Sequence, residues 1–297
     1  MCVGGPPNPM QPTRPHSRAM VARLTRGSMH TEVSEYLARS RPSAVDTPGM
    51  TARFDNKVAL ITGAGSGMGR AITLRLVEEG ASVYAVDIDA GRLQDTKDQG
   101  GDRVALREAD LGSPVVCADV VAECAGEFGR LDVLGNVAGI YFAEHATSVS
   151  LEQYRRLMSV NLDAYFFLAQ AAIPHLLESG GNLVNIASNA GIQGVPYSVP
   201  YAMSKGGVVQ LTRALAVEFI KTSLRVNAIA PAGTRTNITA STSFPPDVDP
   251  DLATRMAGLR GMAEPEEIAA LFAYLASDEA RSVTGAVYTI DNGITIS

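Results

Sequence analysis

The chain has 297 residues, of which 46% are hydrophobic and 19% are charged, the balance of a protein with a substantial core. Its apolar runs all fall short of the roughly 18 residues that a transmembrane helix needs, so we expect no membrane span. The net charge is −6. Residues 1–50 carry six Arg against three acidic residues, which leaves 19 basic and 28 acidic residues for the rest. An acidic main body argues against nucleic acid as a partner.

Residues 1–50 are rich in Pro, Arg, Ser and Met and contain only a short helical pattern near Thr31–Arg39. Such a composition buries too little apolar surface to offset the entropy of ordering, so we predict a disordered extension before one domain at 51–297. The opening stretch is basic and has no acidic residue before Glu32, as in organelle transit peptides. The three cysteines form no even framework, which suits a reducing compartment. We therefore expect a cytoplasmic protein and leave organelle targeting open.

From Lys57 onward, short apolar segments alternate with helical patterns. The predicted strands are Val58–Thr62, Ser82–Asp87, Arg103–Glu108, Val133–Val137, Asn182–Ala187, Leu224–Ile229 and Ala286–Ile290. The predicted helices are Gly67–Glu79, Ser113–Phe128, Leu151–Leu177 in two pieces divided near Asn161, Tyr201–Lys221 and Pro265–Ala276. Strands that are apolar on both faces and alternate with helices form parallel sheets. We therefore predict a single α/β domain, a doubly wound seven-stranded parallel sheet of the Rossmann type with helices on both faces.

Residues 62–69 read T-G-A-G-S-G-M-G and join the first predicted strand to the first predicted helix. The glycines Gly63, Gly65, Gly67 and Gly69 allow a tight turn, and they let a pyrophosphate approach the backbone N–H groups at the positive end of the helix. A tight structural turn is the alternative interpretation. The flanking elements and an acidic residue about twenty positions further on favour dinucleotide binding.

Asp87 ends the second predicted strand, where a carboxylate accepts hydrogen bonds from a ribose diol and repels a 2′-phosphate. The neighbouring positions Ser66, Ile88 and Asp89 carry no basic side chain, so we expect NAD rather than NADP as the cofactor. A strand-end Asp can also cap the next helix, which is compatible with the same role.

Further polar residues lie at predicted carboxyl ends of strands, the edge at which open α/β sheets bind ligands. Asn136 and Gly139 belong to the end of the fourth strand and its loop, and Ser188 follows the fifth strand. Tyr201 and Lys205 are four residues apart on a helix, so both side chains rise from one face. An ammonium beside a phenol lowers the pKa of the phenol, which makes proton transfer workable near neutral pH. An amphipathic helix with Tyr inside and Lys in solvent is the alternative interpretation.

Taken together, these residues resemble the short-chain dehydrogenase/reductase family over nearly all of residues 51–297. The resemblance rests on an ordered set of motifs: T-G-x-x-x-G-x-G at 62–69, Asp87, Asp110, N-x-A-G at 136–139, Asn161, Ser188, Tyr201, Lys205, N-A-I-A-P at 227–231 and D-N-G at 291–293. The chain departs from the family at Val137, often a second Asn, at Ala232, which separates the usual Pro-Gly pair, and at Asn292, usually Gly. Asn also tolerates a left-handed backbone.

The resemblance implies a catalytic group made up of Asn161, Ser188, Tyr201 and Lys205. Tyr201 would be the general acid/base that exchanges a proton with the substrate oxygen, and Ser188 would donate a hydrogen bond to that oxygen. Lys205 would lower the pKa of Tyr201 and hold the nicotinamide ribose, and Asn161 would hold a water that links Lys205 to solvent. The implied cofactor contacts are Gly63, Gly65, Ser66, Gly67, Met68, Gly69, Asp87, Ile88, Asp110, Leu111, Asn136, Ala138, Gly139, Tyr201, Lys205, Pro231, Gly233, Thr234 and Thr236.

Substrate contacts are expected from the loop after the fourth strand, from the segment before Tyr201, and from a Ser/Thr- and Pro-rich segment at about 234–258 that we expect to be a mobile lid. The candidate substrate contacts are Tyr141, Ser188, Gln193 and Tyr201. Apolar side chains nearby suggest a cyclic or apolar secondary alcohol, although they are equally compatible with ordinary packing. The four His are scattered along the chain, so we expect no metal site.

We therefore predict an NAD-dependent enzyme that transfers a hydride between a secondary alcohol or ketone and the nicotinamide. The alternative enzyme is a 3-oxoacyl thioester reductase of the same family. Asp87 without a nearby base argues against it, because such enzymes usually prefer NADPH. The alternative from another class is a catalytically silent dinucleotide sensor, against which the complete Asn–Ser–Tyr–Lys group argues. Because two long helices form dimer faces in this family, we expect a homotetramer.

Overall fold

The computed structural model describes residues 52–254 and 260–296. The described residues all belong to one compact unit, Thr47–Ser297. The predicted extension at 1–50, with its helical pattern near Thr31–Arg39, lies outside the described residues.

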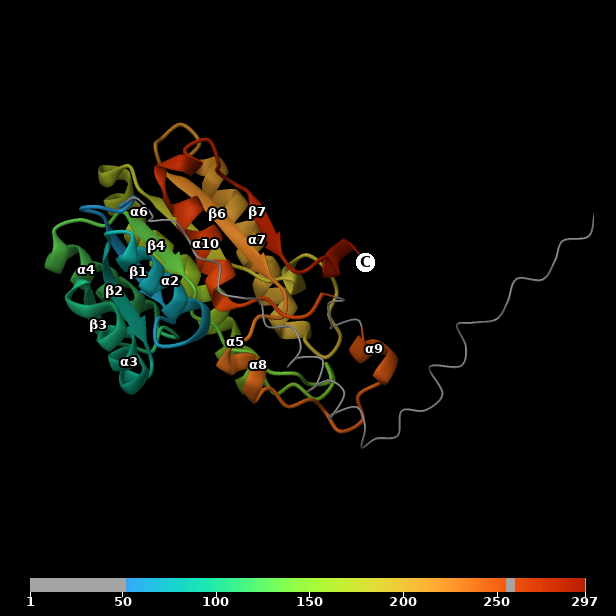
Figure 1. Ribbon diagram of the computed structural model, residues 1–297. Coiled ribbons are helices and arrows are strands. Elements are labelled where there is room, and N and C mark those ends of the chain that lie inside the picture. The colour runs from blue at the N-terminus through green and yellow to red at the C-terminus, as the bar shows by residue number, and fades with distance from the viewer. Residues whose placement is uncertain (1–51, 255–259, 297) are drawn as a thin grey trace, which may run out of the picture. The chain divides into compact units, whose positions relative to one another are not determined.

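The described residues form a seven-stranded sheet in the order β3-β2-β1-β4-β5-β6-β7, and all neighbouring strands are parallel (Figure 1). This confirms the predicted doubly wound Rossmann-type sheet. The chain order reverses between β1 and β4, which is where such sheets bind ligands. The strands are β1 (Val58–Thr62), β2 (Ser82–Asp87), β3 (Val104–Glu108), β4 (Val133–Asn136), β5 (Asn182–Ile186), β6 (Arg225–Pro231) and β7 (Val287–Ile290).

Alternate residues of β1 show that the sheet is covered on both faces. Ala59 and Ile61 belong to one buried cluster, and Val58 and Leu60 belong to the other. Burying one aliphatic side chain fully contributes about 1.5–3 kcal/mol, so hydrophobic stabilisation comes from both faces. The covering helices are α2 (Gly67–Glu78), α3 (Ala90–Gly100) and α10 (Pro265–Ala276) on the first face, and α4 (Pro114–Phe128), α6 (Ala164–Ser179) and α7 (Val199–Glu218) on the second (Figure 1).

Helix α3 has no counterpart among the predicted helices. Its sequence is strongly polar and only Leu93 and Thr96 are buried, so the apolar period that marks a helix is missing. The helix begins at a cap instead, because the Asp89 side chain accepts a hydrogen bond from the N–H of Arg92. The capped first turn of α3 places Arg92 close to the end of β2.

The long helix predicted at 151–177 is divided at Asn161, as expected. Helix α5 (Leu151–Met158) passes into a π-helical turn at Ser159–Asp163, and α6 follows directly. The wider π-turn changes which residues face the neighbouring loop. Such turns are frequent at functional sites.

Helix α7 and the segment expected to be a lid also differ from what the sequence predicts. Helix α7 begins at Val199 rather than at Tyr201, because Pro200 in its first turn is well suited to a helix start. The segment expected to be a mobile lid contains two short helices, α8 (Asn237–Ser241) and α9 (Pro250–Thr254), and residues 255–259 lie outside the described residues. In the described part of the chain, no helix has the length and apolarity needed to cross a membrane.

We predict that replacing Gly69 with Ala destabilises the domain. The added Cβ would overlap the carbonyl group of Gly63, which is backbone and cannot move aside as a flexible side chain can. We expect the free energy of unfolding to fall by about 1–3 kcal/mol, measured by urea denaturation. Gly126→Ala in α4 is the matched control, because nothing lies within 4 Å of its added Cβ. The control should gain stability of about 0.5–1 kcal/mol, and an equal gain for Gly69→Ala would contradict the close packing of the turn.

Candidate active site

The turn between β1 and α2 leaves a helix N-terminus open to an anion. Gly63 and Gly67 have positive φ values of 65° and 49°, which residues with side chains rarely adopt. A Cβ at Gly63 would lie 2.9 Å from the Cα of Ala138, so the turn packs directly against the loop after β4. Ser66 is the N-cap residue and makes no side-chain capping bond, and the first turn of α2 has no acidic residue. The backbone N–H groups of this turn can therefore donate hydrogen bonds to a phosphate.

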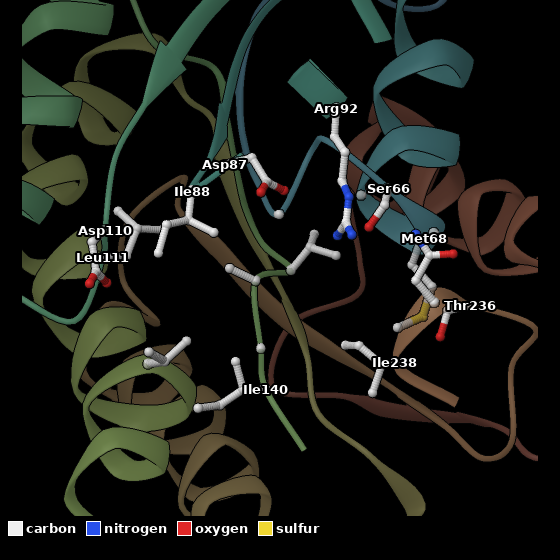
Figure 2. Close-up of a pocket in the computed structure, with 18 of the residues that line it drawn as sticks. Ser66, Met68, Asp87, Ile88, Arg92, Asp110, Leu111, Ile140, Thr236 and Ile238 are labelled. Carbon is white, nitrogen blue, oxygen red and sulfur yellow. The ribbon is translucent and has the colours of Figure 1, made fainter. Parts of the chain in front are cut away.

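A cavity of about 340 Å³ opens at this turn (Figure 2). Its walls come from the glycine turn, from the ends of β2, β3 and β4, and from the segment that contains α8. The structure thus brings most of the predicted cofactor contacts to one cavity. Those that line it are Gly63, Ser66, Gly67, Met68, Gly69, Asp87, Ile88, Asp110, Leu111, Ala138, Gly139 and Thr236.

Two backbone N–H groups hold the carboxylate of Asp87. The N–H of Gly65 donates to Oδ2 at 2.9 Å, and the N–H of Asp89 donates to Oδ1 at 3.1 Å. The expectation that no basic residue flanks Asp87 is wrong in three dimensions. Helix α3 carries Arg92 into the same cavity, where its guanidinium lies between Asp87 and Ser66 (Figure 2). Its Nε is 3.2 Å from Asp89 Oδ2, so the cation is already paired.

Asp110 lines another part of the cavity, where Arg156 of α5 holds its carboxylate. Arg156 Nη1 donates to the two carboxylate oxygens at 2.9 and 3.0 Å, and the N–H of Gly112 donates to Oδ1. Burial raises the pKa of Asp110, but the bonds from Arg156 and Gly112 outweigh burial and leave the pKa below its ordinary value. Asp110 is therefore a fixed anion at the cavity wall, and its contact with an adenine stays a prediction.

A second cavity, of about 90 Å³, adjoins the first. Ser188, which follows β5, lines it together with Tyr201 and Lys205 of α7. Tyr141 also lines it and packs edge-on against Tyr201, with ring centroids 4.9 Å apart. Three of the four predicted catalytic residues therefore meet at the carboxyl edge of the sheet. The predicted contacts Pro231, Thr234 and Thr236 border the same cavity, and the wall shared with the larger cavity consists of Met68, Val137, Gly139, Ile140, Thr236 and Ile238.

Five predicted site residues line neither cavity: Gly65, Asn136, Asn161, Gln193 and Gly233. Asn136 is buried within the sheet, and its Nδ2 donates to Asn185 Oδ1 at 2.9 Å and to the carbonyl oxygen of Tyr165 at 3.3 Å. Its side chain therefore ties β4 to β5 and to α6.

Lys205 is almost completely buried, with 3% of its surface exposed. Its Nζ donates to the carbonyl oxygen of Ile186 at 2.7 Å and to the hydroxyl of Tyr165 at 3.3 Å. The Nζ also lies 5.0 Å from the ring centroid of Tyr165 and 6.0 Å from that of Tyr201. Because burial removes water from the ammonium, it lowers the pKa of Lys205 to about 7.

The pKa of Tyr201 moves in the direction opposite to the predicted one. Burial raises it to about 12, a hydrogen bond with the Ser188 side chain opposes the rise, and Tyr141 adds to it. The expected lowering by Lys205 is wrong for this arrangement, because Lys205 Nζ is turned to the Ile186 carbonyl and its charged form is itself disfavoured by burial. Near neutral pH the phenol is therefore protonated and the amine is only partly charged.

Asn161, in the π-turn, is fully buried and binds the loop after β4. Its Oδ1 accepts a hydrogen bond from the N–H of Ile140 at 2.8 Å, and its Nδ2 donates to the carbonyl oxygen of Ile140 at 2.9 Å. Asn161 thus fixes part of the wall that the two cavities share. Its part in a proton relay stays a prediction.

Tyr165 of α6 belongs to the site, although the sequence reasoning did not single it out. Its surface is 1% exposed, and its hydroxyl lies within donating distance of the carbonyl oxygens of Ala138, at 3.0 Å, and Ile186, at 3.2 Å. In the sequence it lies in the apolar stretch A-Y-F-F-L-A, which is typical of helix core. The available signal was its spacing of four residues from Asn161, because residues four apart on a helix lie on one face.

The geometry around the turn fits a dinucleotide. The helix N-terminus is open, a side chain at Gly67 would press on Thr236 across the cavity, and Asp87 is held in place by backbone N–H groups. In the adjoining cavity, a phenol and a buried amine can exchange a proton with a substrate oxygen. The fold and the site together define a dinucleotide-dependent oxidoreductase.

Comparison with known proteins narrows this class to a family. A family model described as Enoyl-(Acyl carrier protein) reductase matches residues 63–295. The chain is 37% identical over 254 residues to the meso-2,3-butanediol dehydrogenase of Serratia marcescens. The alignment covers 82% of this chain and 97% of that protein. It is 34% identical over 251 residues to the cyclohexanol dehydrogenase of Acinetobacter sp. (strain SE19), in an alignment that covers 83% of this chain and 98% of that protein. The chain belongs to the short-chain dehydrogenase/reductase family and is an oxidoreductase of alcohols and ketones.

Solved structures agree with this assignment. The crystal structure of 3-ketoacyl-(acyl-carrier-protein) reductase from Brucella melitensis complexed with NADH matches with a TM-score of 0.75 and 29% identity, covering 82% of this chain and 100% of that chain. Levodione reductase matches with a TM-score of 0.75 and 32% identity, covering 82% and 99%. An NAD(P) dinucleotide is the cofactor typical of this family.

We predict that Lys205 titrates near pH 7 in the cofactor-free protein, because burial disfavours its ammonium form. The chain has only four lysines, Lys57, Lys97, Lys205 and Lys221, so carbon-13 NMR of protein labelled at lysine Cε can follow each one. Lys205→Met identifies the resonance. A midpoint close to the ordinary lysine value of about 10.4 would contradict the burial of this group.

Proposed function

We propose that the protein is an NAD-dependent oxidoreductase that transfers a hydride between a cyclic or apolar secondary alcohol, or the matching ketone, and the nicotinamide. Tyr201 is its general acid/base. The observation that carries the proposal is that Ser188, Tyr201 and Lys205 line one cavity that shares a wall with the cavity at the glycine turn. A dinucleotide in the larger cavity and a substrate oxygen in the smaller one can therefore meet.

In this mechanism the residues of the chain handle the proton. NAD, when bound, supplies the carbon that accepts or returns the hydride. Tyr201 removes the hydroxyl proton in alcohol oxidation and returns a proton to the carbonyl oxygen in ketone reduction. Ser188 orients the substrate oxygen by donating a hydrogen bond. Lys205, when charged, stabilises the phenolate and passes the proton on toward Asn161 and solvent.

The preference for NAD depends on two side chains of opposite charge. Asp87 would accept hydrogen bonds from the ribose hydroxyls and repel a 2′-phosphate. Arg92 lies in the same cavity and would attract that phosphate, but its pairing with Asp89 partly neutralises it. We therefore assign the preference for NAD to Asp87 and regard Arg92 as the residue that weakens it.

The lining of the smaller cavity supports an apolar substrate. Apart from the catalytic residues and a few threonines, its lining is mainly apolar and includes Ile140, Tyr141, Ile186, Ala187, Pro231 and Ile238. Butanediol and cyclohexanol, in the names of the two relatives described above, share a secondary alcohol group. A secondary alcohol on an apolar skeleton is therefore the substrate class that we propose.

A 3-oxoacyl thioester reductase remains the second candidate, and one observation favours it. The reductase from Brucella melitensis that matches this fold is described as a complex with NADH. A reductase of this activity can therefore bind NADH, so the preference for NAD that we assign to Asp87 does not argue against this activity. The homotetramer and the cytoplasmic location remain predictions from the sequence.

We predict that Tyr201→Phe lowers kcat for alcohol oxidation by about 10²- to 10⁴-fold, because the general base is removed. The assay uses NAD with cyclohexanol, 2,3-butanediol and, in the reducing direction, an acetoacetyl thioester with NADH. Tyr84→Phe is the matched control, since it removes a buried phenol oxygen that contacts Glu123, outside both cavities. Wild-type protein that binds NADH but turns over none of the panel would favour the sensor instead.

A second prediction concerns the choice of cofactor. Asp87→Ala should weaken catalysis with NAD and improve it with NADP. The substitution removes the acceptor for the ribose hydroxyls of NAD, and it also removes the charge that repels the 2′-phosphate of NADP. The kcat/KM with NAD should fall and the kcat/KM with NADP should rise, each by about 10- to 100-fold, which is the effect of a hydrogen bond to a charged group. The gain with NADP should disappear in Asp87→Ala/Arg92→Ala if Arg92 attracts the phosphate. Unchanged kcat/KM ratios in Asp87→Ala would remove Asp87 from cofactor selection.

A further inference from the structure

The phenol of Tyr165 is almost completely buried beside the catalytic residues, and the mechanism above gives it no task. Its oxygen is 3.3 Å from Lys205 Nζ, and its ring centroid is 5.0 Å from the same atom. The phenol carries one hydrogen, which the carbonyl oxygens of Ala138 and Ile186 share at 3.0 and 3.2 Å. Its hydroxyl oxygen therefore faces Lys205 as an acceptor.

Tyr165 and Ile186 together account for two of the three hydrogens of the Lys205 ammonium. Nζ donates to the carbonyl oxygen of Ile186 at 2.7 Å and to the Tyr165 hydroxyl. An ammonium has three donors, so one is left for a bound molecule. The two protein contacts hold the amine in place while its third hydrogen is donated to a bound molecule.

The charged form of Lys205 depends on these neutral acceptors. Among the described residues, the titratable groups that face its Nζ are Tyr165 on α6 and Tyr201 on α7, while Tyr141, from the loop after β4, faces Tyr201. These phenols are neutral near pH 7, and burial is the influence that moves the pKa of Lys205. Each acceptor therefore matters more than it would beside a carboxylate, because a buried charge without partners is costly.

The fold presents Tyr165 at this point through the π-turn before α6. The turn directs Asn161 to the backbone of Ile140, while Tyr165, on the first turn of α6, reaches the carbonyl oxygens of Ala138 and Ile186. The Tyr165 hydroxyl thus joins the ends of β4 and β5 to the lysine of α7.

We propose that Tyr165 is a positioning residue for Lys205: its hydroxyl oxygen holds the lysine ammonium at the base of the smaller cavity. This proposal rests on the proposed function for its catalytic consequence, the pH at which Tyr201 accepts a proton. A purely structural tie between β4 and β5 is the competing explanation, and it predicts no change in the titration of Lys205.

The test is Tyr165→Phe, which removes only the phenol oxygen, with Tyr84→Phe as the matched control for losing a buried phenol oxygen elsewhere. The first readout is the midpoint of the Lys205 carbon-13 titration in the cofactor-free protein. The second readout is kcat/KM for alcohol oxidation as a function of pH. Thermal denaturation of each variant reports any general loss of stability.

We expect the Lys205 midpoint to fall by about 0.5–1 pH unit in Tyr165→Phe, because the charged amine loses an acceptor. Where a bound ligand keeps Lys205 charged, the phenolate of Tyr201 then loses cationic support, so the acidic limb of kcat/KM moves to higher pH by a similar amount. Its high-pH plateau stays within about twofold of wild type. Tyr84→Phe leaves both readouts unchanged. A Lys205 midpoint and an acidic limb that coincide with wild type would overturn the proposal, whatever happens to thermal stability.

If Tyr165→Phe does not fold, Tyr201→Phe tests the same contact from the other side. Its Lys205 midpoint should match wild type, because Tyr165 and Ile186 still hold the amine. A shift there of about one unit would assign the holding role to Tyr201 and reject the proposal. The NMR readout needs no turnover. If the wild type is inactive but its Lys205 midpoint depends on Tyr165, the proposed function is rejected and the role of Tyr165 is kept. If the wild type is active but its Lys205 midpoint does not depend on Tyr165, the role of Tyr165 is rejected and the proposed function is kept.

Discussion

The site depends on one buried hydroxyl, that of Thr62 at the end of β1. Its Oγ1 accepts hydrogen bonds from the N–H groups of Val137 at 2.9 Å and Ala138 at 3.1 Å, and it donates to the carbonyl oxygen of Gly135 at 3.2 Å. These bonds join the strand that leads into the glycine turn to the loop after β4, where the chain order of the sheet reverses. Leaving such buried backbone groups unpaired costs about 1–3 kcal/mol each. The wall shared by the two cavities begins at this junction.

The second constraint is electrostatic. The smaller cavity places an amine and phenols in a buried site and surrounds the amine with carbonyl and hydroxyl oxygens. Tyr201 has a pKa of about 12 and Lys205 a pKa of about 7, so a preformed ion pair is not the resting arrangement. Keeping Tyr201 neutral and Lys205 only partly charged reduces the desolvation cost of two buried charges. The charge that the chemistry needs can then develop when a ligand supplies new partners.

The residues of the dinucleotide turn could be predicted because they follow from local rules. A strand that is followed by Gly63 and leads through a short turn into a helix has few backbone solutions. Asn292 adopts the left-handed conformation, with a φ of 53°, that its position suggested. Helix α3 escaped prediction because it is polar and is started by a cap rather than by an apolar period. That omission concealed Arg92, which only the helix brings into the cavity beside Asp87. Asn136 shows the reverse case, since a motif residue points into the sheet.

By itself, the sequence determined the order of the strands and of most helices, the place of the glycine turn and the grouping of Ser188, Tyr201 and Lys205 at one edge of the sheet. These depend on the spacing of apolar residues, glycines and polar strand ends, which is local information. Only the tertiary structure decided that Lys205 turns to Ile186 and Tyr165, and that burial sets its charge and that of Tyr201. The physical reason is that burial and hydrogen-bond partners come from the packing of α6, β5 and α7 against one another, which no local sequence pattern specifies.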